Sequence, residues 1–189
     1  MYEATPDPYC HPGTTVLRNR LHLAGQAALD AFEADAVTQR GSEPLPAGRL
    51  TLAHFRAVHR HLFQDVYAWA GRTRTVRIAK NESMFCYPEH IDMQARDLFS
   101  WLADHDRLRN LSAEDFAAQG AHFLSELNAI HMFREGNGRA QMAFFAMLAD
   151  RAGHRLDFDR LDPEPFLAAM IAAFKGREDD LAVQIRNMI

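Results

Sequence analysis

The feature that most constrains the fold of this chain is a glycine-flanked turn between two apolar helical segments. Before the turn, apolar residues recur at helical spacing through residues 116–130. After it, from Gly138 to about Gly153, apolar residues lie on all sides of a predicted helix, which is typical of a central, buried helix. We therefore expect two core helices that hold the turn rigidly between them.

The turn, residues 131–139, reads His-Met-Phe-Arg-Glu-Gly-Asn-Gly-Arg. Gly136 and Gly138 flank Asn137, and glycine permits a positive φ and leaves room for a ligand close to the backbone. Successive N–H groups of such a turn can converge on an anion, and the following helix adds the positive end of its dipole. The turn therefore predicts a phosphate-binding site.

His131, Glu135 and Arg139 add further chemistry to this turn. An imidazole with an unperturbed pKa near 6.5 can take a proton from a hydroxyl around neutral pH. A carboxylate is a ligand for Mg²⁺, which usually binds one or two carboxylates together with phosphates. An arginine can bind phosphate charge through two parallel donors. Each residue alone is more often structural, whereas together they favour a site that binds a nucleotide.

Composition favours one globular domain, residues 1–189, in the cytoplasm. Hydrophobic residues make up 48% and charged residues 24%, which is ordinary for a folded domain. The net charge of −4 argues against a nucleic-acid partner. Cys10 and Cys86 are too few for a disulfide framework, and neither a signal-peptide pattern nor a membrane-spanning run occurs in the sequence. No membrane partner is expected.

Apolar periodicity in the rest of the chain predicts a mostly α-helical fold. The first helix is expected from residue 16 to about residue 40, after an irregular arm and with Thr14 or Thr15 as its cap. Later helices are expected to begin at cap or proline signals, namely Thr51, Pro88, Ser112, Asp162 and either Asp179 or Asp180. The core is expected to cover about residues 14–175, and residues 176–189 are expected to form a C-terminal helix.

Three histidines in the second predicted helix raise a metal-binding alternative. His54, His59 and His61 are separated by five and two residues. Ligand pairs on one helical face need a separation of three or four. Structural roles are therefore favoured for all three.

A β-hairpin is predicted between the second and third helices. Residues 72–78 are rich in types that favour extended geometry, residues 80–82 indicate a turn, and residues 83–87 suit a return strand. The exposed edge of a hairpin can bind an extended segment of a partner through main-chain hydrogen bonds.

The nine-residue turn resembles the signature of the Fic family, H-x-F-x-[D/E]-G-N-G-R-x-x-R. The matching residues are His131, Phe133, Glu135, Gly136, Asn137, Gly138 and Arg139. Met132 replaces a common proline, and Met142 replaces the second arginine, which the family uses near the terminal phosphate of ATP. The arm, with Tyr9 and the run Pro12-Gly13-Thr14, is similar to the start of Fic toxins that are partnered by a separate small antitoxin.

The resemblance implies a Fic-like helical domain with a β-hairpin flap over the active site. It also implies transfer of AMP from ATP, with Mg²⁺, to a hydroxyl side chain (Ser, Thr or Tyr) of a target protein. By the resemblance, His131 is the base, Glu135 the Mg²⁺ ligand, and Gly136, Asn137, Gly138 and Arg139 the phosphate binders. The flap that docks the target comprises Ile78, Ala79, Lys80, Asn81, Glu82, Ser83, Met84 and Phe85. Implied targets include the ATPase subunits of type II topoisomerases and, for secreted relatives, host GTPases.

Two alternatives and one regulatory expectation follow. Because Met142 removes a cation, a different nucleotide or phosphate-linked donor is the first alternative. A catalytically silent module that binds peptides at the hairpin is the second. No segment matches the family's inhibitory pattern [S/T]-x-x-x-E-[G/N], so any inhibitor is expected to be a separate small chain.

Overall fold

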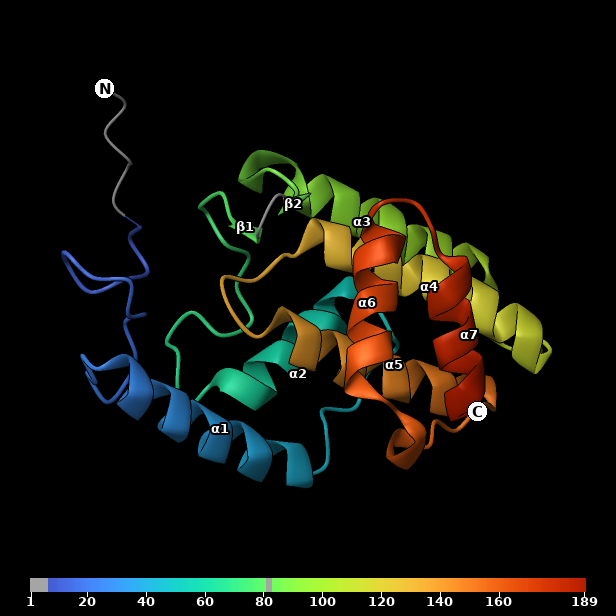
Figure 1. Ribbon diagram of the computed structural model, residues 1–189, viewed down its shortest axis with the longest axis horizontal. Helices are drawn as coiled ribbons and strands as arrows, with labels where there is room; N and C mark the ends of the chain where they lie inside the picture. Colours follow the sequence, from blue (N-terminus) through green and yellow to red (C-terminus); the bar gives the residue numbers. More distant parts are fainter. Residues whose placement is uncertain (1–6, 81–82) are drawn as a thin grey trace.

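The computed structural model describes residues 7–80 and 83–189, and within them the protein is mostly helical (Figure 1). The elements, in chain order, are α1 (Gln26–Ser42), α2 (Leu52–Phe63), β1 (Ala79–Lys80), β2 (Ser83–Met84), α3 (Pro88–Asp104), η1 (Asp106–Leu108), α4 (Ala113–Ile130), α5 (Asn137–Ala152), η2 (Phe158–Arg160), α6 (Pro163–Phe174) and α7 (Asp179–Met188). No helix in the described ranges is long and apolar enough to cross a membrane. The predicted mostly α fold with one short hairpin is confirmed.

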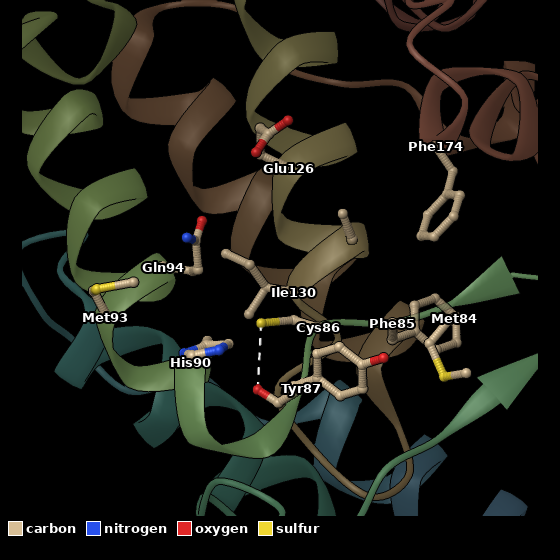
Figure 2. Close-up of a pocket in the computed structure, with 11 residues that line it drawn as sticks. Met84, Phe85, Cys86, Tyr87, His90, Met93, Gln94, Glu126, Ile130 and Phe174 are labelled. Carbon is tan, nitrogen blue, oxygen red and sulfur yellow. Dashed lines mark hydrogen bonds between the residues drawn. The ribbon is translucent and has the colours of Figure 1, made fainter.

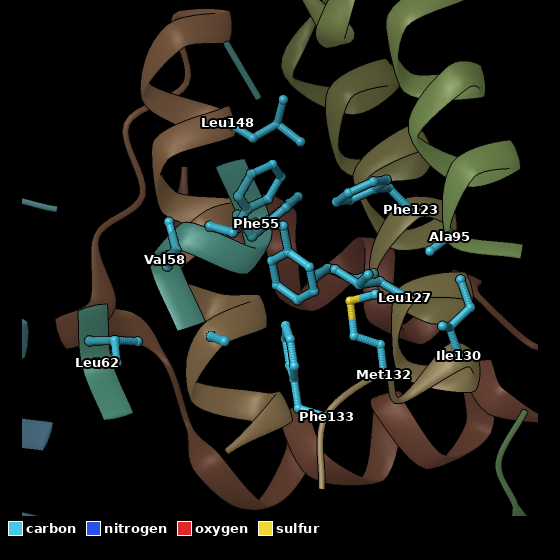
Figure 3. Packing of buried hydrophobic residues seen from close by; sticks show 14 of the residues in the cluster. Phe55, Val58, Leu62, Ala95, Phe123, Leu127, Ile130, Met132, Phe133 and Leu148 are labelled. Atoms are coloured by element: carbon cyan, nitrogen blue, oxygen red, sulfur yellow. The ribbon is translucent and has the colours of Figure 1, made fainter. Parts of the chain in front are cut away.

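The centre of the fold is formed by α4 and α5. α4 packs against α3, α5, α6 and α7, and α5 also packs against α2. Phe144 of α5 meets Phe55 of α2 edge to face, and Phe55 lies 5.2 Å, centroid to centroid, from Phe133 in the turn between α4 and α5. Figure 3 shows Phe55, Phe123, Leu127 and Phe133 converging in this core. The two core helices therefore support the turn from both sides, as predicted.

Most helices begin at the residues that the sequence predicted. The side chains of Thr51, Ser112 and Asp162 accept hydrogen bonds from backbone N–H groups at the starts of α2, α4 and α6. α3 begins at Pro88, and α7 begins at Asp179. The apolar residues that recur at helical spacing along α3 are all buried, and they are Ile91, Ala95, Leu98, Phe99 and Leu102.

The first helix begins at Gln26, not at residue 16 as predicted. Leu17 instead forms a β-bridge with Cys10, and Leu21 is 55% exposed. The buried Asn19 side chain holds the intervening backbone, because it donates to the carbonyls of Leu17 and Leu23 and accepts from Leu23 N. The apolar residues of this segment thus belong to an irregular arm that packs on the core, and not to a helix.

The hairpin is shorter than predicted. β1 and β2 pair antiparallel, with Ala79 opposite Met84 and Lys80 opposite Ser83. Residues 72–78 do not form a strand, because their backbone follows the turn between α4 and α5: Arg74 N donates to Met132 O at 3.0 Å. The predicted turn residues Asn81 and Glu82 lie outside the described residues.

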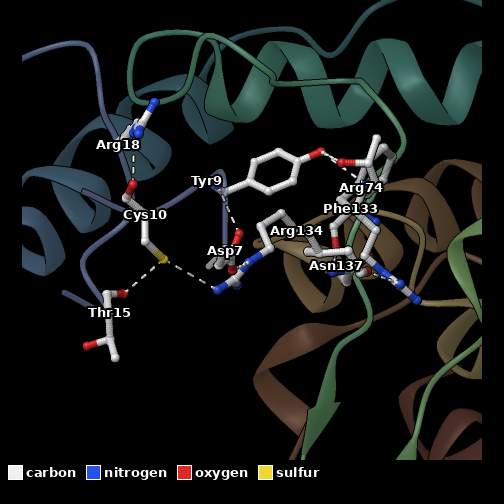
Figure 4. A network of polar contacts seen from close by, with 11 residues as sticks. Asp7, Tyr9, Cys10, Thr15, Arg18, Arg74, Phe133, Arg134 and Asn137 are labelled. Atoms are coloured by element: carbon white, nitrogen blue, oxygen red, sulfur yellow. Dashed lines mark hydrogen bonds and ion pairs between the residues drawn. The ribbon is translucent and has the colours of Figure 1, made fainter. Parts of the chain in front are cut away.

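The N-terminal arm packs against the turn between α4 and α5 (Figure 4). Arg134 donates to the Asp7 carboxylate at 2.8 Å, and the Tyr9 hydroxyl accepts a hydrogen bond from Thr75 N at 3.2 Å. The Tyr9 ring meets Trp69 edge to face, with centroids 5.5 Å apart. The arm is irregular, as predicted, and its contacts link it to the predicted site.

Candidate active site

The turn between α4 and α5 is closed by the side chain of Asn137. Phe133 N donates to Asn137 Oδ1, and Asn137 Nδ2 donates to Phe133 O, both at 2.8 Å. Asn137 is only 4% exposed. Its amide is therefore used within the protein, and only its backbone remains for a ligand.

The two glycines of the turn have different surroundings. Gly136 has a φ of +77°, and a Cβ there would lie 2.2 Å from Phe63 Cζ. A Cβ on Gly138 would meet nothing within 4 Å, and Gly138 is exposed. Gly136 is thus required by packing and backbone geometry, whereas Gly138 leaves open space beside the start of α5.

We expect Gly136→Ala to lower the free energy of unfolding by about 2–3 kcal/mol, because it combines a left-handed φ with a ring contact that must shift. Gly138→Ala is the matched control and should leave stability within about 0.5 kcal/mol, since α5 accepts alanine there. Urea denaturation of both variants measures the difference. Equal stabilities would contradict the packing argument.

The start of α5 is suited to an anion. No described side chain caps this helix, and the first N–H groups of a helix have no partner within it. The helix dipole adds partial positive charge at the same point. The prediction that residues 136–139 bind phosphate stays a prediction, and the structure places Gly138 and Arg139 of this set at an exposed helix start.

His131 is half-buried at the end of α4, where it has a left-handed φ of 46°. Its ring stacks on Phe85, which follows β2, with centroids 3.8 Å apart. Nδ1 lies 3.2 Å from Asn128 O and thus donates its proton there, which leaves Nε2 as the free acceptor. Burial lowers the pKa of His131 to about 4, and the charges of Arg74 and Lys80 act in the same direction. The expectation of an unperturbed pKa near 6.5 was wrong, because the flap covers the ring.

His59 of α2 packs against the turn between α4 and α5. Its ring stacks on Phe133 at 3.7 Å, its Nε2 lies 3.0 Å from Glu135 O, and its Nδ1 accepts from Gly71 N at 2.9 Å. Nε2 therefore carries the proton. Burial lowers the pKa of His59 to about 4. His54 and His61 also contact backbone carbonyls, in agreement with the structural roles that the sequence favoured for these histidines.

Stability should fall as the pH falls from about 6.5 to about 4. In that window the unfolded chain protonates His59 and His131 while the folded chain keeps them neutral, so the unfolded state binds more protons. Above about pH 6.5 the two residues should have no effect. Each histidine should lower the free energy of unfolding by about 2 kcal/mol when the pH falls from 7 to 5. Urea denaturation at both pH values measures this, and His59→Asn should remove about half of the pH dependence, whereas the exposed His105→Asn should leave it unchanged. A pH-independent free energy of unfolding would contradict the burial effect.

Glu135 lies beside the start of α5. Its Oε1 accepts from Gly136 N at 2.8 Å and lies 3.5 Å from an Arg139 nitrogen. Oε2 has no partner among the described residues, and the side chain is 44% exposed. One carboxylate oxygen is therefore open to a cation that also binds phosphate, which fits Mg²⁺.

Arg139 is held by a residue that sequence reasoning did not select. Glu33 of α1 accepts from Arg139 at 2.5 Å, and the Tyr67 hydroxyl donates to the same carboxylate. The Arg139 guanidinium lies 4.7 Å from the centroid of the Phe63 ring. Burial raises the pKa of Tyr67, and its bond to Glu33 adds to this effect. Glu33 precedes Arg139 by more than a hundred residues, so no local pattern could identify the pair.

Arg74 is the second residue that the sequence did not reveal. Its guanidinium is 1% exposed and donates to four carbonyls, those of Val76 and Cys86 at 2.6 Å, His131 at 2.8 Å and Ile130 at 3.3 Å. Burial lowers its pKa. Arg74 thus joins the segment before β1, the segment after β2 and the end of α4.

The flap lies next to His131, and a groove of about 550 Å³ lies beside it (Figure 2). Ala79, Lys80 and Met84 are exposed, Ile78 is half-buried, and Phe85 is buried against His131. For Ser83 only the backbone pairing is described. The groove is lined by flap residues and by residues of α3, α4 and α6, among them Met93, Ile130 and Phe174.

The two departures from the signature have different surroundings. Met132 is 1% exposed and packs in the core. Met142 is half-buried on α5, one turn after Arg139. The first methionine thus has a structural place in the core, and the second leaves an apolar side chain where the signature has a cation.

The comparisons with known proteins identify the family. The sequence model of the Fic/DOC family matches residues 49–149, more than half of the chain, and the chain belongs to this family. It is 52% identical over 189 residues to a probable protein adenylyltransferase, y4lH, of Sinorhizobium fredii, covering 100% of this chain and 98% of that protein. It is 37% identical to the protein adenylyltransferase VbhT of Bartonella schoenbuchensis. That alignment covers 98% of this chain and 40% of VbhT.

A solved structure agrees with the assignment. The crystal structure of the BepC protein of Bartonella tribocorum, with bound AMPPNP, is similar to this fold with a TM-score of 0.84 and 26% sequence identity. The alignment covers 95% of each chain. The Fic-like helical domain expected from the sequence is thus confirmed.

Proposed function

We propose that this chain is a protein adenylyltransferase that transfers AMP from ATP to a hydroxyl side chain of a target protein. The observation that carries the proposal is the turn between α4 and α5, which places His131, Glu135 and the uncapped start of α5 in one loop. The Sinorhizobium fredii relative, which is named a probable protein adenylyltransferase and is matched over 98% of its length, supports the same activity.

In this proposal, the nucleotide phosphates lie against the N–H groups of residues 137–139, where the missing Cβ of Gly138 leaves open space, whereas Gly136 N already donates to Glu135 Oε1. Arg139 adds a positive charge next to them. Glu135 Oε2 would hold Mg²⁺, which would neutralise phosphate charge when bound. The turn is rigid before the ligand arrives, because Asn137 and His59 already hold it.

His131 acts as the general base. It is neutral at physiological pH, so its free Nε2 accepts the proton of the target hydroxyl. The hydroxyl oxygen forms a bond to the α-phosphorus of ATP, and the bond from that phosphorus to the oxygen bridging to the β-phosphate breaks. Pyrophosphate leaves with the electron pair, and the AMP group stays on the target.

We propose that the flap positions the target. The exposed edge residues Ala79 and Lys80 can pair with an extended target segment. The adjoining groove offers exposed Met84 and Met93, which are 56% and 53% exposed, to side chains of that segment. The modified hydroxyl would then lie next to His131, because Phe85 connects the flap to the His131 ring.

The finer parts of the proposal concern partners and compartment. Targets of the type II topoisomerase class, a separate small antitoxin and a cytoplasmic location remain predictions of the sequence. Affinity capture of the tagged chain from cells of its source tests the antitoxin, and recovery of no small partner would count against it.

Met142 favours one alternative, an enzyme that prefers a different donor. Loss of a charge-assisted bond to a terminal phosphate lowers affinity for a triphosphate by about tenfold or more when nothing replaces it. Binding of ATP, ADP, GTP and a diphosphate-linked donor, compared in one titration series, distinguishes the two proposals. Tight binding of ATP above the others supports adenylyl transfer.

The direct test of the proposed function is transfer of α-labelled ATP, with Mg²⁺, to proteins of a bacterial lysate supplemented with topoisomerase subunits. A labelled band is expected with the wild type. No label with any protein would contradict the proposal if ATP binding has been confirmed in the same preparation.

We expect Glu33→Gln to raise the affinity for ATP about two- to fivefold. The substitution removes a negative charge that competes with phosphate for Arg139, and the gain is modest because Arg139 is 41% exposed. The amide oxygen can still accept the Tyr67 hydroxyl proton. Calorimetric titration with ATP measures the effect, and Asp35→Asn, at an exposed position of α1, is the matched control. A lower affinity in Glu33→Gln would show that Glu33 holds Arg139 in its binding position instead.

A further inference from the structure

A second group of positive charges lies far from the turn that carries the proposed function. A pocket of about 430 Å³ is lined by Arg49, Leu50, Arg107, Arg109 and Arg151. Arg49 precedes α2, Arg107 and Arg109 belong to the η1 region, and Arg151 lies in the last turn of α5. Arg139 and Arg151 are twelve residues apart on α5, which corresponds to about 18 Å along the helix axis. The pocket is therefore distinct from the proposed nucleotide site.

Most of this charge has no counterion among the described residues. Arg109 pairs with Asp106. In the part of the chain that the structure describes, Arg49, Arg107 and Arg151 take part in no ion pair. This excess occurs in a chain whose net charge is −4. Like charges that converge on one pocket repel one another, and an anion bound between them would relieve this repulsion.

Backbone contacts hold two of the guanidinium groups in place. Arg107 Nε donates to Arg49 O at 3.0 Å, and Arg151 donates to Gly48 O. Each contact uses one donor of a group that has five. The remaining donors are pre-oriented around the pocket, and the planar fork of arginine matches phosphate oxygens.

The backbone around the pocket is strained. Seven non-glycine residues of the described chain have a positive φ, and one of them is His131. Five of the others line the pocket or adjoin it, and they are Leu50, Asp106, Arg107, Leu108 and Asn110. Such conformations cost about 1–3 kcal/mol each and persist where the surroundings enforce them, commonly at binding sites. The strain thus gathers at the proposed catalytic histidine and at the arginine pocket.

We propose that the arginine pocket binds an oligophosphate, either free or as the terminal phosphates of a nucleotide. The lining offers no aromatic ring on which a base could stack, so recognition rests on the phosphates. The site is small and concave, and the net charge of the chain is negative. Both properties suit a compact anion better than an extended nucleic acid, which binds to a basic stripe.

The test is calorimetric titration of the whole chain with inorganic tripolyphosphate, and then with ATP and a single-stranded oligonucleotide. Three variants are compared with the wild type: Arg107→Gln/Arg151→Gln, the charge reversal Arg49→Glu, and the active-site control Arg139→Gln. Arg49→Glu keeps both backbone contacts that order the pocket, so it guards against a folding defect in the double variant. Arg96→Gln, at an exposed position of α3, controls for general charge loss.

We expect tripolyphosphate binding to fall about 100-fold in the double variant, since each lost charge-assisted bond costs about tenfold. It should fall at least tenfold in Arg49→Glu and persist in Arg139→Gln and Arg96→Gln. Because ATP also binds the proposed nucleotide site, the source of the ligand is identified from the double variant: loss of tripolyphosphate binding with unchanged ATP binding would identify free oligophosphate, and loss of a second ATP-binding event would identify a nucleotide. Loss of binding in Arg139→Gln alone, or tighter binding of the oligonucleotide than of tripolyphosphate, would overturn the proposal. The pocket variants should still transfer AMP, because the proposed active site lies elsewhere. Loss of tripolyphosphate binding with AMP transfer retained therefore tests the arginine pocket separately from the proposed function.

Discussion

His131→Ala is expected to lower the rate of AMP transfer by about 100- to 10,000-fold, the usual contribution of a general base. The ring is half-buried and its removal should leave the turn in place, because Asn137, His59 and Arg74 hold the backbone independently. Affinity for ATP should therefore change little. Label transfer from α-labelled ATP and calorimetric titration with ATP measure the two quantities on the same preparation.

The matched control is His105→Ala, at an exposed position after α3. It should retain the wild-type rate. A second measurement is the pH profile of the wild type, in which the acid limb should lie below pH 6.5, because burial under Phe85 lowers the pKa of His131 to about 4. Full activity in His131→Ala would remove this residue from the mechanism, and an acid limb above pH 6.5 would contradict its burial.

The elements that the sequence predicted well are those whose signals are local. The five apolar residues of α3 recur at helical spacing and are buried together. Thr51 and Ser112 cap α2 and α4 because a cap depends on a side chain and the N–H group three residues later. Periodicity and capping both act within one or two turns, and the sequence displays such short distances directly.

The predictions that failed depend on contacts between distant segments. The apolar residues near residue 17 matched a helical spacing, yet Arg20 N donates to Val66 O and Asn19 orders an irregular arm. Residues 72–78 have strand-forming composition, but the two-stranded sheet of the described residues pairs only residues 79–80 with residues 83–84. β-propensity describes how side chains fit a pleated sheet, so it does not predict a strand where no sheet is present.

The candidate site shows the same division. The residues of the turn are contiguous, so one segment of sequence displays His131, Glu135 and Arg139 together. Their electrostatics depend on residues far away in the chain: Phe85 buries His131, and Glu33 forms an ion pair with Arg139. A motif thus identifies the candidate groups, whereas their pKa values and free charge require the fold.

Arg74→Met is expected to lower the free energy of unfolding by about 3 kcal/mol or more. The variant fills most of the same space, but it leaves the carbonyls of Val76, Cys86, Ile130 and His131 without the donor that now satisfies them. A buried polar group without a partner costs about 1–3 kcal/mol, and the gain from no longer burying a charge offsets part of the sum. For a domain of this size the loss corresponds to a decrease in Tm of about 6–12 °C.

The variant also separates stability from positioning. Arg74 links the flap to the end of α4, so its loss should shift Phe85 relative to His131 and lower the transfer rate even at temperatures where the variant is fully folded. Arg74→Lys should restore little, because one ammonium group cannot reach carbonyls that the guanidinium contacts from three nitrogens. Arg77→Met is the matched control, since the Arg77 side chain is 65% exposed and should contribute less than about 1 kcal/mol. Thermal denaturation and label transfer on the three variants measure both effects. A Tm of Arg74→Met equal to that of Arg77→Met would show that water replaces the guanidinium at these carbonyls, and the flap would then have to be positioned by the packing of Phe85 alone.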